Sequence, residues 1–315
     1  MPTGRQGSIR LFQFRGIHVF LHWSWFLVAA YEIQSRNGRY SSVAWNVAEY
    51  LALFLIVTLH EFGHALACRQ VGGQANQIVL WPLGGVAYVD PPPRPGATLW
   101  SIAAGPLVNV VLLPILLGLV WLSGSLGWAQ TMPDLYRLVD AVLSIDVVLL
   151  VFNILPIYPL DGGQIFRALL WFVLGRARSL QVATILGLIG VAGFIGLAIW
   201  TRSIWYAAIA AFMLMNCWSG FKHAQQLLRF AKLPRRHGVA CPACKASPPI
   251  GDLWKCGKCA QPFDFFQTQG VCPYCSTQFT QTRCLECGAV HAVSEWFSPA
   301  MSVSSTFGSE MGGQR

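Results

Sequence analysis

Apolar residues follow one another almost without interruption between positions 17 and 219, whereas polar residues and cysteines dominate after Lys222. A helix needs about 20 apolar residues to cross a bilayer. Six stretches meet or approach that length: 17–34, 43–68, 99–123, 138–157, 180–200 and 203–219. Only "TRS" separates the last two, so we expect them to form a tight helical hairpin. The pattern predicts an α-helical polytopic membrane protein with about six transmembrane helices, followed by a small soluble domain.

The composition agrees with this pattern. Hydrophobic residues make up 54% of the 315 positions and charged residues 11%, against about 25% charged residues in a typical soluble protein. The net charge of +9 would also suit a nucleic-acid-binding protein. Because most basic residues stand beside apolar stretches, retention of positive charge on the cytoplasmic side explains them better. Nucleic acid is therefore not expected as a partner.

The basic residues also predict the orientation of the chain. With six crossings, one side of the membrane holds Arg5, Arg10, Arg15, Arg69, Arg94, Arg167, Arg176, Arg178, Lys222, Arg229, Lys232, Arg235 and Arg236. The other side holds Arg36, Arg39, Arg137 and Arg202. This imbalance predicts that both termini are cytoplasmic. The first stretch carries two histidines and no small-x-small cleavage pattern, so we expect a retained span rather than a signal peptide.

The second apolar stretch contains the sequence "LHEFGH", with His60, Glu61 and His64. Residues four apart lie on one face of a helix, so both histidines can reach a single ion, while the glutamate can approach its bound water. This is the H-E-x-x-H arrangement of zinc peptidases. Satisfied core histidines are the alternative, but three polar groups inside a membrane span need compensation.

A third ligand is available at the end of the fourth stretch, in "NILPIYPLDGG". Catalytic zinc has three protein ligands and one open position. Pro156 and Pro159 interrupt the helix there, and two glycines allow an unusual backbone around Asp161. Span parity predicts that Asp161 and the two histidines lie at the same depth. Alone, "PLDGG" would indicate an ordinary Asp-Gly turn.

Taken together, "HEFGH", "AGPLVN" and "NILPIYPLDGG", in this order, resemble the site-2 protease family of intramembrane zinc metalloproteases over residues 10–225. The resemblance implies that His60, His64 and Asp161 hold a catalytic zinc ion and that Glu61 is the catalytic base. It also implies a role for Asn109 near the scissile bond, and a location in the cell membrane of a prokaryote. Transmembrane proteins in the bilayer would be its substrates.

A predicted β element and three polar residues lie near these motifs. The segment "IVLWPLGGVAYVD", residues 78–90, predicts a β element that either offers an edge to substrate or only packs on the cytoplasmic face. Asn109 either stabilises the developing oxyanion or makes an interhelical hydrogen bond. Glu49 and Asp146 are expected to have structural roles within the helical bundle.

Eight cysteines after Lys222 form four C-x-x-C pairs: "CPAC", "CGKC", "CPYC" and "CLEC". This spacing predicts a β-rich zinc-ribbon domain with two structural zinc ions, since cytoplasmic thiols stay reduced and disulfides are disfavoured there. The simplest pairing is sequential: Cys241, Cys244, Cys256 and Cys259 around one ion and Cys272, Cys275, Cys284 and Cys287 around the other. A shifted pairing, in which "CGKC" and "CPYC" share an ion, stays open.

The sequence thus predicts a membrane metalloprotease domain (1–233), a tandem zinc-ribbon domain (238–297) with a protein partner of its own, and a disordered tail (298–315). Zinc is the expected cofactor, one ion catalytic and two structural. Two other functions would fit parts of this sequence. A metal transporter would explain the intramembrane ligands but not Glu61, and an inactive adaptor acting through its ribbons would be expected to lack a catalytic residue. None is missing, so an intramembrane zinc metalloendopeptidase is favoured.

Overall fold

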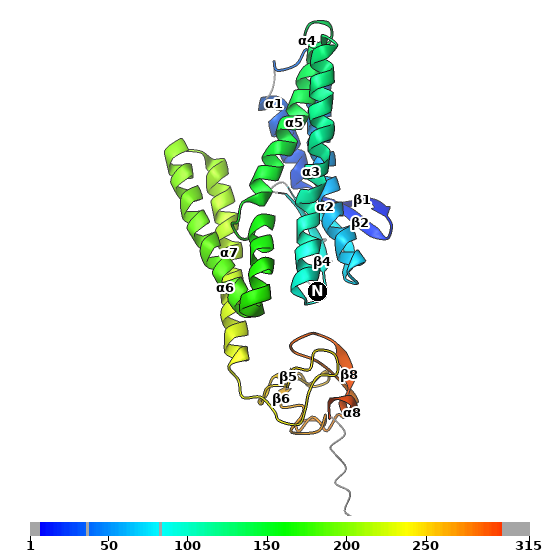
Figure 1. The fold of residues 1–315 in the computed structure, drawn as a ribbon, viewed down its shortest axis with the longest axis vertical. Helices are drawn as coiled ribbons and strands as arrows, with labels where there is room; N and C mark the ends of the chain where they lie inside the picture. Colours follow the sequence, from blue (N-terminus) through cyan, green and yellow to red (C-terminus); the bar gives the residue numbers. More distant parts are fainter. Residues whose placement is uncertain (1–6, 36–37, 82–83, 298–315) are drawn as a thin grey trace, which may run out of the picture. The chain divides into compact units, whose positions relative to one another are not determined.

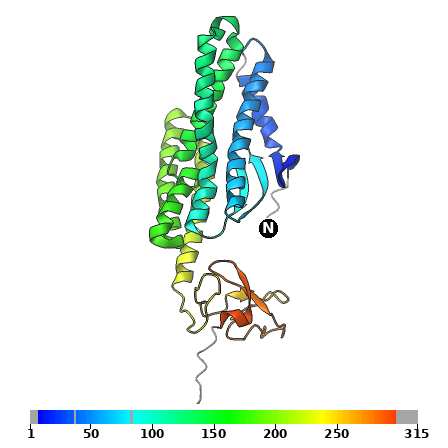
Figure 2. The same ribbon diagram turned by 45° about the vertical axis from the view of Figure 1, so that its right-hand side comes forward.

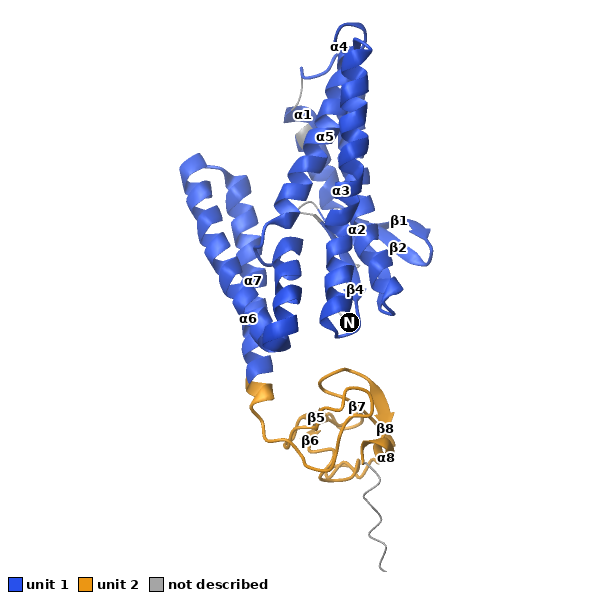
Figure 3. Cartoon of the chain, viewed as in Figure 1, with its two compact units in different colours: residues 1–228 blue, residues 229–315 orange. Residues whose placement is uncertain are grey.

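A computed structural model describes residues 7–35, 38–81 and 84–297. The chain divides into two compact units, Met1–Leu228 and Arg229–Arg315 (Figure 3). We call them the membrane unit and the ribbon unit and describe each by itself. The functional domain ranges 1–233 and 238–297 stay predictions, and the tail 298–315 lies outside the described residues.

Four helices of the chain are long and apolar enough to cross a membrane: α2 (Val43–Gln70), α3 (Pro95–Ser125), α6 (Asp161–Thr201) and α7 (Ile204–Ala231). The protein is therefore an integral membrane protein. Helix α6 has a kink at Gly175, where φ is 76° and ψ is 170°, and the chain reverses direction there (Figure 1). Its second arm and α7 form the hairpin that the sequence predicts.

Six membrane-spanning helices are not found in the described residues. The predicted first span, 17–34, consists of strand β2 (Ile17–His22) followed by α1 (Ser24–Ser35). Twelve residues of helix extend about 18 Å, which is shorter than the roughly 30 Å hydrocarbon core. Hydropathy cannot distinguish a buried strand from a buried helix, and β2 is a strand because neighbouring strands pair with it. Helix α5 (Pro133–Ile154) is long enough but carries four charged residues: Asp134, Arg137, Asp140 and Asp146.

A four-stranded sheet with the order β1-β2-β3-β4 lies beside α2 (Figure 2). It comprises β1 (Ser8–Phe14), β2, β3 (Gln74–Trp81) and β4 (Gly84–Asp90). Strands β2 and β3 are parallel and the other pairs are antiparallel. The central strands are buried against α2, which explains the apolar run 78–81 at the end of β3. The β element predicted at 78–90 is thus part of β3 and all of β4, and β4 is an edge strand.

Helices α2 and α3 approach each other closely because glycines stand where they cross. A Cβ added at Gly63 of α2 would lie 2.6 Å from the backbone oxygen of Ala104 in α3. Small residues at such a contact let two helix backbones come together inside a membrane. The close approach brings the side chains of α2 directly against the backbone of α3. A short helix α4 (Trp128–Thr131) joins α3 to α5.

The ribbon unit contains two small antiparallel sheets, β5 (Trp254–Lys255) with β6 (Pro262–Phe263) and β7 (Gln281–Arg283) with β8 (Val290–Ala292), followed by α8 (Val293–Trp296). Its core consists of one valine, aromatic residues and cysteines: Val239, Cys241, Trp254, Cys256, Phe263, Phe265, Phe266, Cys272, Cys284 and Trp296. So few apolar side chains form a small core, and domains of this size commonly need metal ions to be stable.

Candidate active site

The three residues predicted to bind the catalytic metal converge on one point inside the membrane unit. His60 Nε2 lies 3.0 Å and His64 Nε2 lies 3.3 Å from the same oxygen, Oδ2 of Asp161. The two Nε2 atoms are 3.2 Å apart, and both histidines are buried. The ligands come from α2 and from the first residue of α6, which are 101 and 97 positions apart in the chain. Helix geometry places the histidines together, and tertiary packing adds the aspartate.

The hydrogen bonds of the opposite ring nitrogens place a proton on each Nδ1 atom, so in the neutral imidazole both Nε2 atoms are free to bind a metal ion. His64 Nδ1 lies 2.9 Å from the backbone oxygen of Ser101, which can only accept, so Nδ1 must carry the hydrogen. His60 Nδ1 lies 2.7 Å from Asn109 Oδ1, also an acceptor. The two Nε2 atoms and a carboxylate oxygen therefore face one another with their lone pairs available, and a metal cation bound between them would satisfy all three.

The spacing of these atoms fits zinc. Ligand bonds of 2.0–2.1 Å in a tetrahedron put neighbouring ligand atoms about 3.3 Å apart, and the three separations are 3.0, 3.2 and 3.3 Å. Two histidines and one carboxylate leave the fourth position open, as in catalytic sites. The donor set and its geometry thus suit a catalytic zinc ion.

Glycine is required at two positions around the metal ligands because no room is left there for a Cβ atom. A Cβ at Gly105 would lie 2.2 Å from His64 Nε2 and 2.8 Å from His60 Nε2. A Cβ at Gly162 would lie 2.2 Å from the backbone oxygen of Ile154. The "AGP" and "LDGG" segments therefore allow the backbone of α3 and the start of α6 to approach the metal site as closely as they do.

Glu61 lies beside this centre and contacts the edge strand β4. Its Oε2 atom accepts a hydrogen bond of 2.8 Å from the backbone N–H of Ala87. A Cβ at Gly85 would fall 2.5 Å from Glu61 Oε1, so only glycine permits β4 to lie this close. The carboxylate is buried, and β4 is the element that orients it. Sequence analysis found the glutamate but not this contact.

Asn109 does not point into open space beside the ligands. It is fully buried, its Oδ1 faces His60 Nδ1, and its Nδ2 donates to Asp146 Oδ1 over 2.7 Å. Both ends of the amide are engaged, as in the interhelical role that the sequence left open, and its role near a scissile bond stays a prediction. Asp146, expected to be merely structural, lies in this network. Its sequence signal was a carboxylate within an apolar stretch.

Glu49 has the structural surroundings expected of it. Its Oε2 accepts a hydrogen bond of 2.5 Å from the Tyr40 hydroxyl, and Arg39 lies 3.5 Å from its other oxygen. These contacts connect the start of α2 to the preceding loop.

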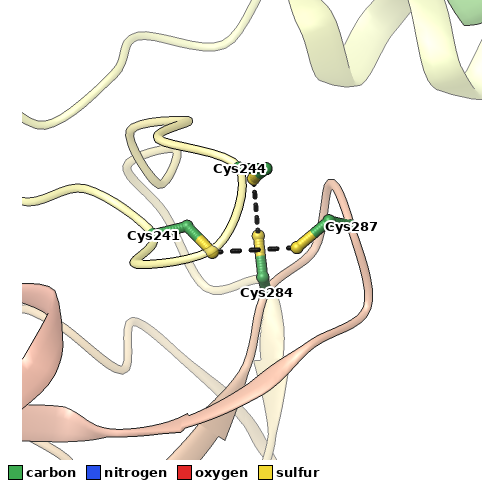
Figure 4. Close-up of side chains that lie close together, drawn as sticks. All are labelled: Cys241, Cys244, Cys284 and Cys287. Atoms are coloured by element: carbon green, nitrogen blue, oxygen red, sulfur yellow. Dashed lines mark hydrogen bonds between the residues drawn. The ribbon is translucent and has the colours of Figure 1, made fainter. Parts of the chain in front are cut away.

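The eight cysteines of the ribbon unit form two clusters, one nested within the other along the chain. One holds Cys241, Cys244, Cys284 and Cys287, and the other holds Cys256, Cys259, Cys272 and Cys275. The sequential pairing is therefore wrong and the shifted one describes the structure. Figure 4 shows the outer cluster, in which the first and last C-x-x-C pairs meet.

The sulfur separations fit zinc and not disulfides. Neighbouring Sγ atoms lie 3.6–3.8 Å apart, as expected for a tetrahedron with Zn–S bonds of about 2.3 Å, whereas a disulfide bond measures about 2.05 Å. The hydroxyl and backbone N–H of Thr277 lower the pKa of Cys275 to about 6. A thiolate, the form that binds metal, is thus favoured at this position.

A helical membrane bundle that gathers two histidines, an aspartate and a buried glutamate at one point defines the class of intramembrane metalloproteins. Comparison with known proteins gives the family. The sequence matches peptidase family M50 over residues 48–141 and 127–197. Over these residues, which include the candidate metal ligands and Glu61, the chain is similar to this family, to which the site-2 proteases belong.

Two relatives and one solved structure illustrate the similarity. A zinc metalloprotease of Methanocaldococcus jannaschii is 35% identical over 182 residues, 57% of this chain and 50% of the relative. A relative from Synechocystis is 27% identical over 238 residues, 69% of this chain and 61% of the relative. The chain thus spans about half to three-fifths of the length of these relatives. The structure of the site-2 protease from M. jannaschii, 28% identical, aligns with a TM-score of 0.49 over 68% of this chain and 95% of that one.

Proposed function

We propose that this protein is a zinc metalloendopeptidase that hydrolyses peptide bonds within or near transmembrane segments of other membrane proteins. The observation that carries the proposal is the convergence of the two imidazole Nε2 atoms and the Asp161 carboxylate beside Glu61, inside a membrane unit. A transporter site would need the three ligands but has no use for a buried carboxylate held by a neighbouring strand.

The chain's own residues would divide the chemistry between them. Zinc held by His60, His64 and Asp161 supplies polarisation of the scissile carbonyl and acidification of water. Glu61 takes the proton of the attacking water and passes it to the leaving amine. A single hydrogen bond from the Ala87 N–H holds Glu61 Oε2 in place, so the other oxygen, Oε1, is left to accept the proton and pass it on.

We also propose that β4 presents the substrate. It is the last strand of its sheet, and the N–H of Ala87 points away from β3 towards Glu61. A substrate segment that unwinds and adds to this edge would take over that N–H and release the glutamate for catalysis. Binding and activation of the base would then occur in one step.

The proposal extends to topology and partners. The chain crosses the membrane of a prokaryotic cell six times with both termini in the cytoplasm, β2 with α1 forming the first crossing and α5 with the start of α6 the fourth. A strand can lie at that depth because β1 and β3 pair with β2 on both sides. The ribbon unit, with one structural zinc ion in each cysteine cluster, binds a protein partner.

The decisive experiment compares Glu61→Gln with wild-type protein reconstituted with a labelled transmembrane substrate. Loss of the base should lower turnover by about 10²–10⁴-fold while zinc content stays unchanged. Glu49→Gln, also buried in α2 but bonded to Tyr40, serves as a control and should keep near-normal turnover. Wild-type rates in Glu61→Gln would exclude this glutamate as the base.

A further inference from the structure

A chain of three side chains connects a metal ligand to a buried carboxylate on another helix. His60 Nδ1 donates to Asn109 Oδ1 and Asn109 Nδ2 donates to Asp146 Oδ1, and both distances are 2.7 Å. The chain runs from α2 through α3 to α5. Asn109 and Asp146 are both 0% exposed. We call this set the Asp146 relay.

A structural role alone explains Asp146 poorly. Its second oxygen, Oδ2, is buried and has no hydrogen-bond partner among the described residues. A carboxylate with an unsatisfied oxygen in a membrane unit costs stability, and an asparagine or an apolar residue would pack there at less cost. A function that needs a hydrogen-bond acceptor at position 146 explains the aspartate better.

The chemistry of the amide supplies that purpose. An asparagine side chain has nearly the same shape in both orientations, so Asn109 could present either its oxygen or its NH₂ group to His60. Asp146 can only accept when ionised, and therefore holds the NH₂ end on its own side. The oxygen must then face His60 Nδ1, which keeps its proton and leaves Nε2 free to bind metal.

His64 provides an internal comparison. Its Nδ1 is paired with a backbone oxygen, that of Ser101, which cannot exchange donor for acceptor. The tautomer of His64 is thus fixed by the backbone of α3, whereas the tautomer of His60 depends on a side chain that can turn over. Only the second case needs a further residue to decide the orientation.

We propose that Asp146 is a positioning residue that fixes the orientation of Asn109 and, through it, the metal-binding tautomer of His60. The inference rests on the proposed zinc site. Replacing Asp146 allows the amide to turn, so that His60 Nδ1 becomes an acceptor and the proton moves to Nε2. A His60 in that form no longer offers a lone pair to the ion.

The test measures zinc per full-length chain over a series of buffered free-zinc concentrations. Wild-type protein should hold three ions, and the two in the ribbon unit serve as an internal reference. Asp146→Leu should lower the affinity for one of the three by about 10–100-fold, the range for residues that orient metal ligands. Asp140→Leu, an exposed aspartate of the same helix, is the matched control and should bind three ions as wild type does.

A second variant distinguishes orientation from packing. Asp146→Asn keeps the shape of the side chain but adds a competing hydrogen-bond donor, and should weaken the binding of the same zinc ion. Adding Asn109→Asp to it exchanges carboxylate and amide. An acceptor again faces His60 Nδ1, and the NH₂ group, now on residue 146, again pairs with a carboxylate oxygen, now on residue 109. The double variant should recover the affinity. A residue needed only for packing would not respond to this exchange.

The outcomes separate the inference from the proposed function. If wild-type protein binds only two ions and His60→Ala changes nothing, the zinc site itself is refuted. If wild type binds three ions and Asp146→Leu and Asp146→Asn bind them with unchanged affinity, the relay does not set the tautomer. Failure of the double variant to recover, with α-helical content intact, would likewise overturn the proposal. If Asp146→Leu does not insert, Asp146→Asn and the double variant decide alone.

Discussion

The two kinds of metal site in this chain are built in opposite ways. In the membrane unit, long helices and a sheet position His60, His64 and Asp161, and the glycines of α2 and α3 set how closely they meet. In the ribbon unit, short strands of two or three residues surround the cysteine clusters. The fold of the membrane unit positions its metal ligands, whereas in the ribbon unit the metal sites are expected to stabilise the fold.

The difference follows from the size of each core. The long helices of the membrane unit satisfy most of their backbone groups by internal hydrogen bonds, so we expect the bundle not to depend on the ion. The ribbon unit has one small aromatic cluster and strands too short to be stable alone. Two zinc ions, one in each proposed cysteine site, would replace the missing apolar core. An open ligand position is therefore useful in the first site, while four cysteines close the others.

Removing metal should reveal the contrast most clearly. A strong chelator is expected to unfold the ribbon unit of the full-length protein, because structural zinc contributes about 10–16 kcal/mol to such folds. The membrane unit should lose hydrolysis but keep its helices. Hydrogen exchange followed by mass spectrometry would report both units in one experiment. Persistent protection of residues 238–297 without metal would contradict the comparison.

The nested arrangement of cysteines can be tested with pairs of substitutions. Cys241→Ala with Cys284→Ala removes two ligands from one cluster and should cost one zinc ion per chain. Cys241→Ala with Cys256→Ala removes one ligand from each cluster and should cost up to two. Sequential pairing predicts the reverse. Zinc per chain, measured beside an unaltered membrane site, distinguishes the two patterns.

Gly105→Ala should damage the membrane site without affecting the ribbon. The added Cβ would lie 2.2 Å from His64 Nε2, so the histidine must leave its place and the third ion should bind at least about 10-fold more weakly. Gly118→Ala, in the same helix with nothing within 4 Å of the added atom, is the control. Equal zinc affinity in both variants would mean that α3 moves freely relative to α2.

Gly85→Ala should have a smaller effect that spares the metal. Its Cβ would meet the Glu61 side chain at 2.3–2.5 Å, which pushes β4 or the base out of position. We expect kcat to fall about 10–100-fold, part of the contribution of a general base, at unchanged zinc content. Gly96→Ala meets only Phe172 at 3.9 Å and should retain normal turnover. Zinc loss in Gly85→Ala would instead show that β4 supports the ligands themselves.

Much of the membrane site could be predicted from local spacing. His60 and His64 stand four residues apart in an apolar stretch, and any α-helix puts such residues on one face. The C-x-x-C pairs likewise bring two sulfurs together by local chain geometry. In both cases the distances depend on a few consecutive residues, so the sequence alone determines which atoms can share an ion.

Contacts between distant segments were decided only by the tertiary structure. Hydropathy predicted a helix over residues 17–34, whereas Ile17–His22 forms a strand because it pairs with β1 and β3. The outer cysteine cluster joins cysteines 40 and 46 residues apart, and no local rule selects among such combinations. The contact of Asn109 with Asp146 joins two helices 37 residues apart. Local geometry determined what each segment of this protein can bind, and packing determined which segments meet, because long-range contacts depend on how all the helices and strands fit together.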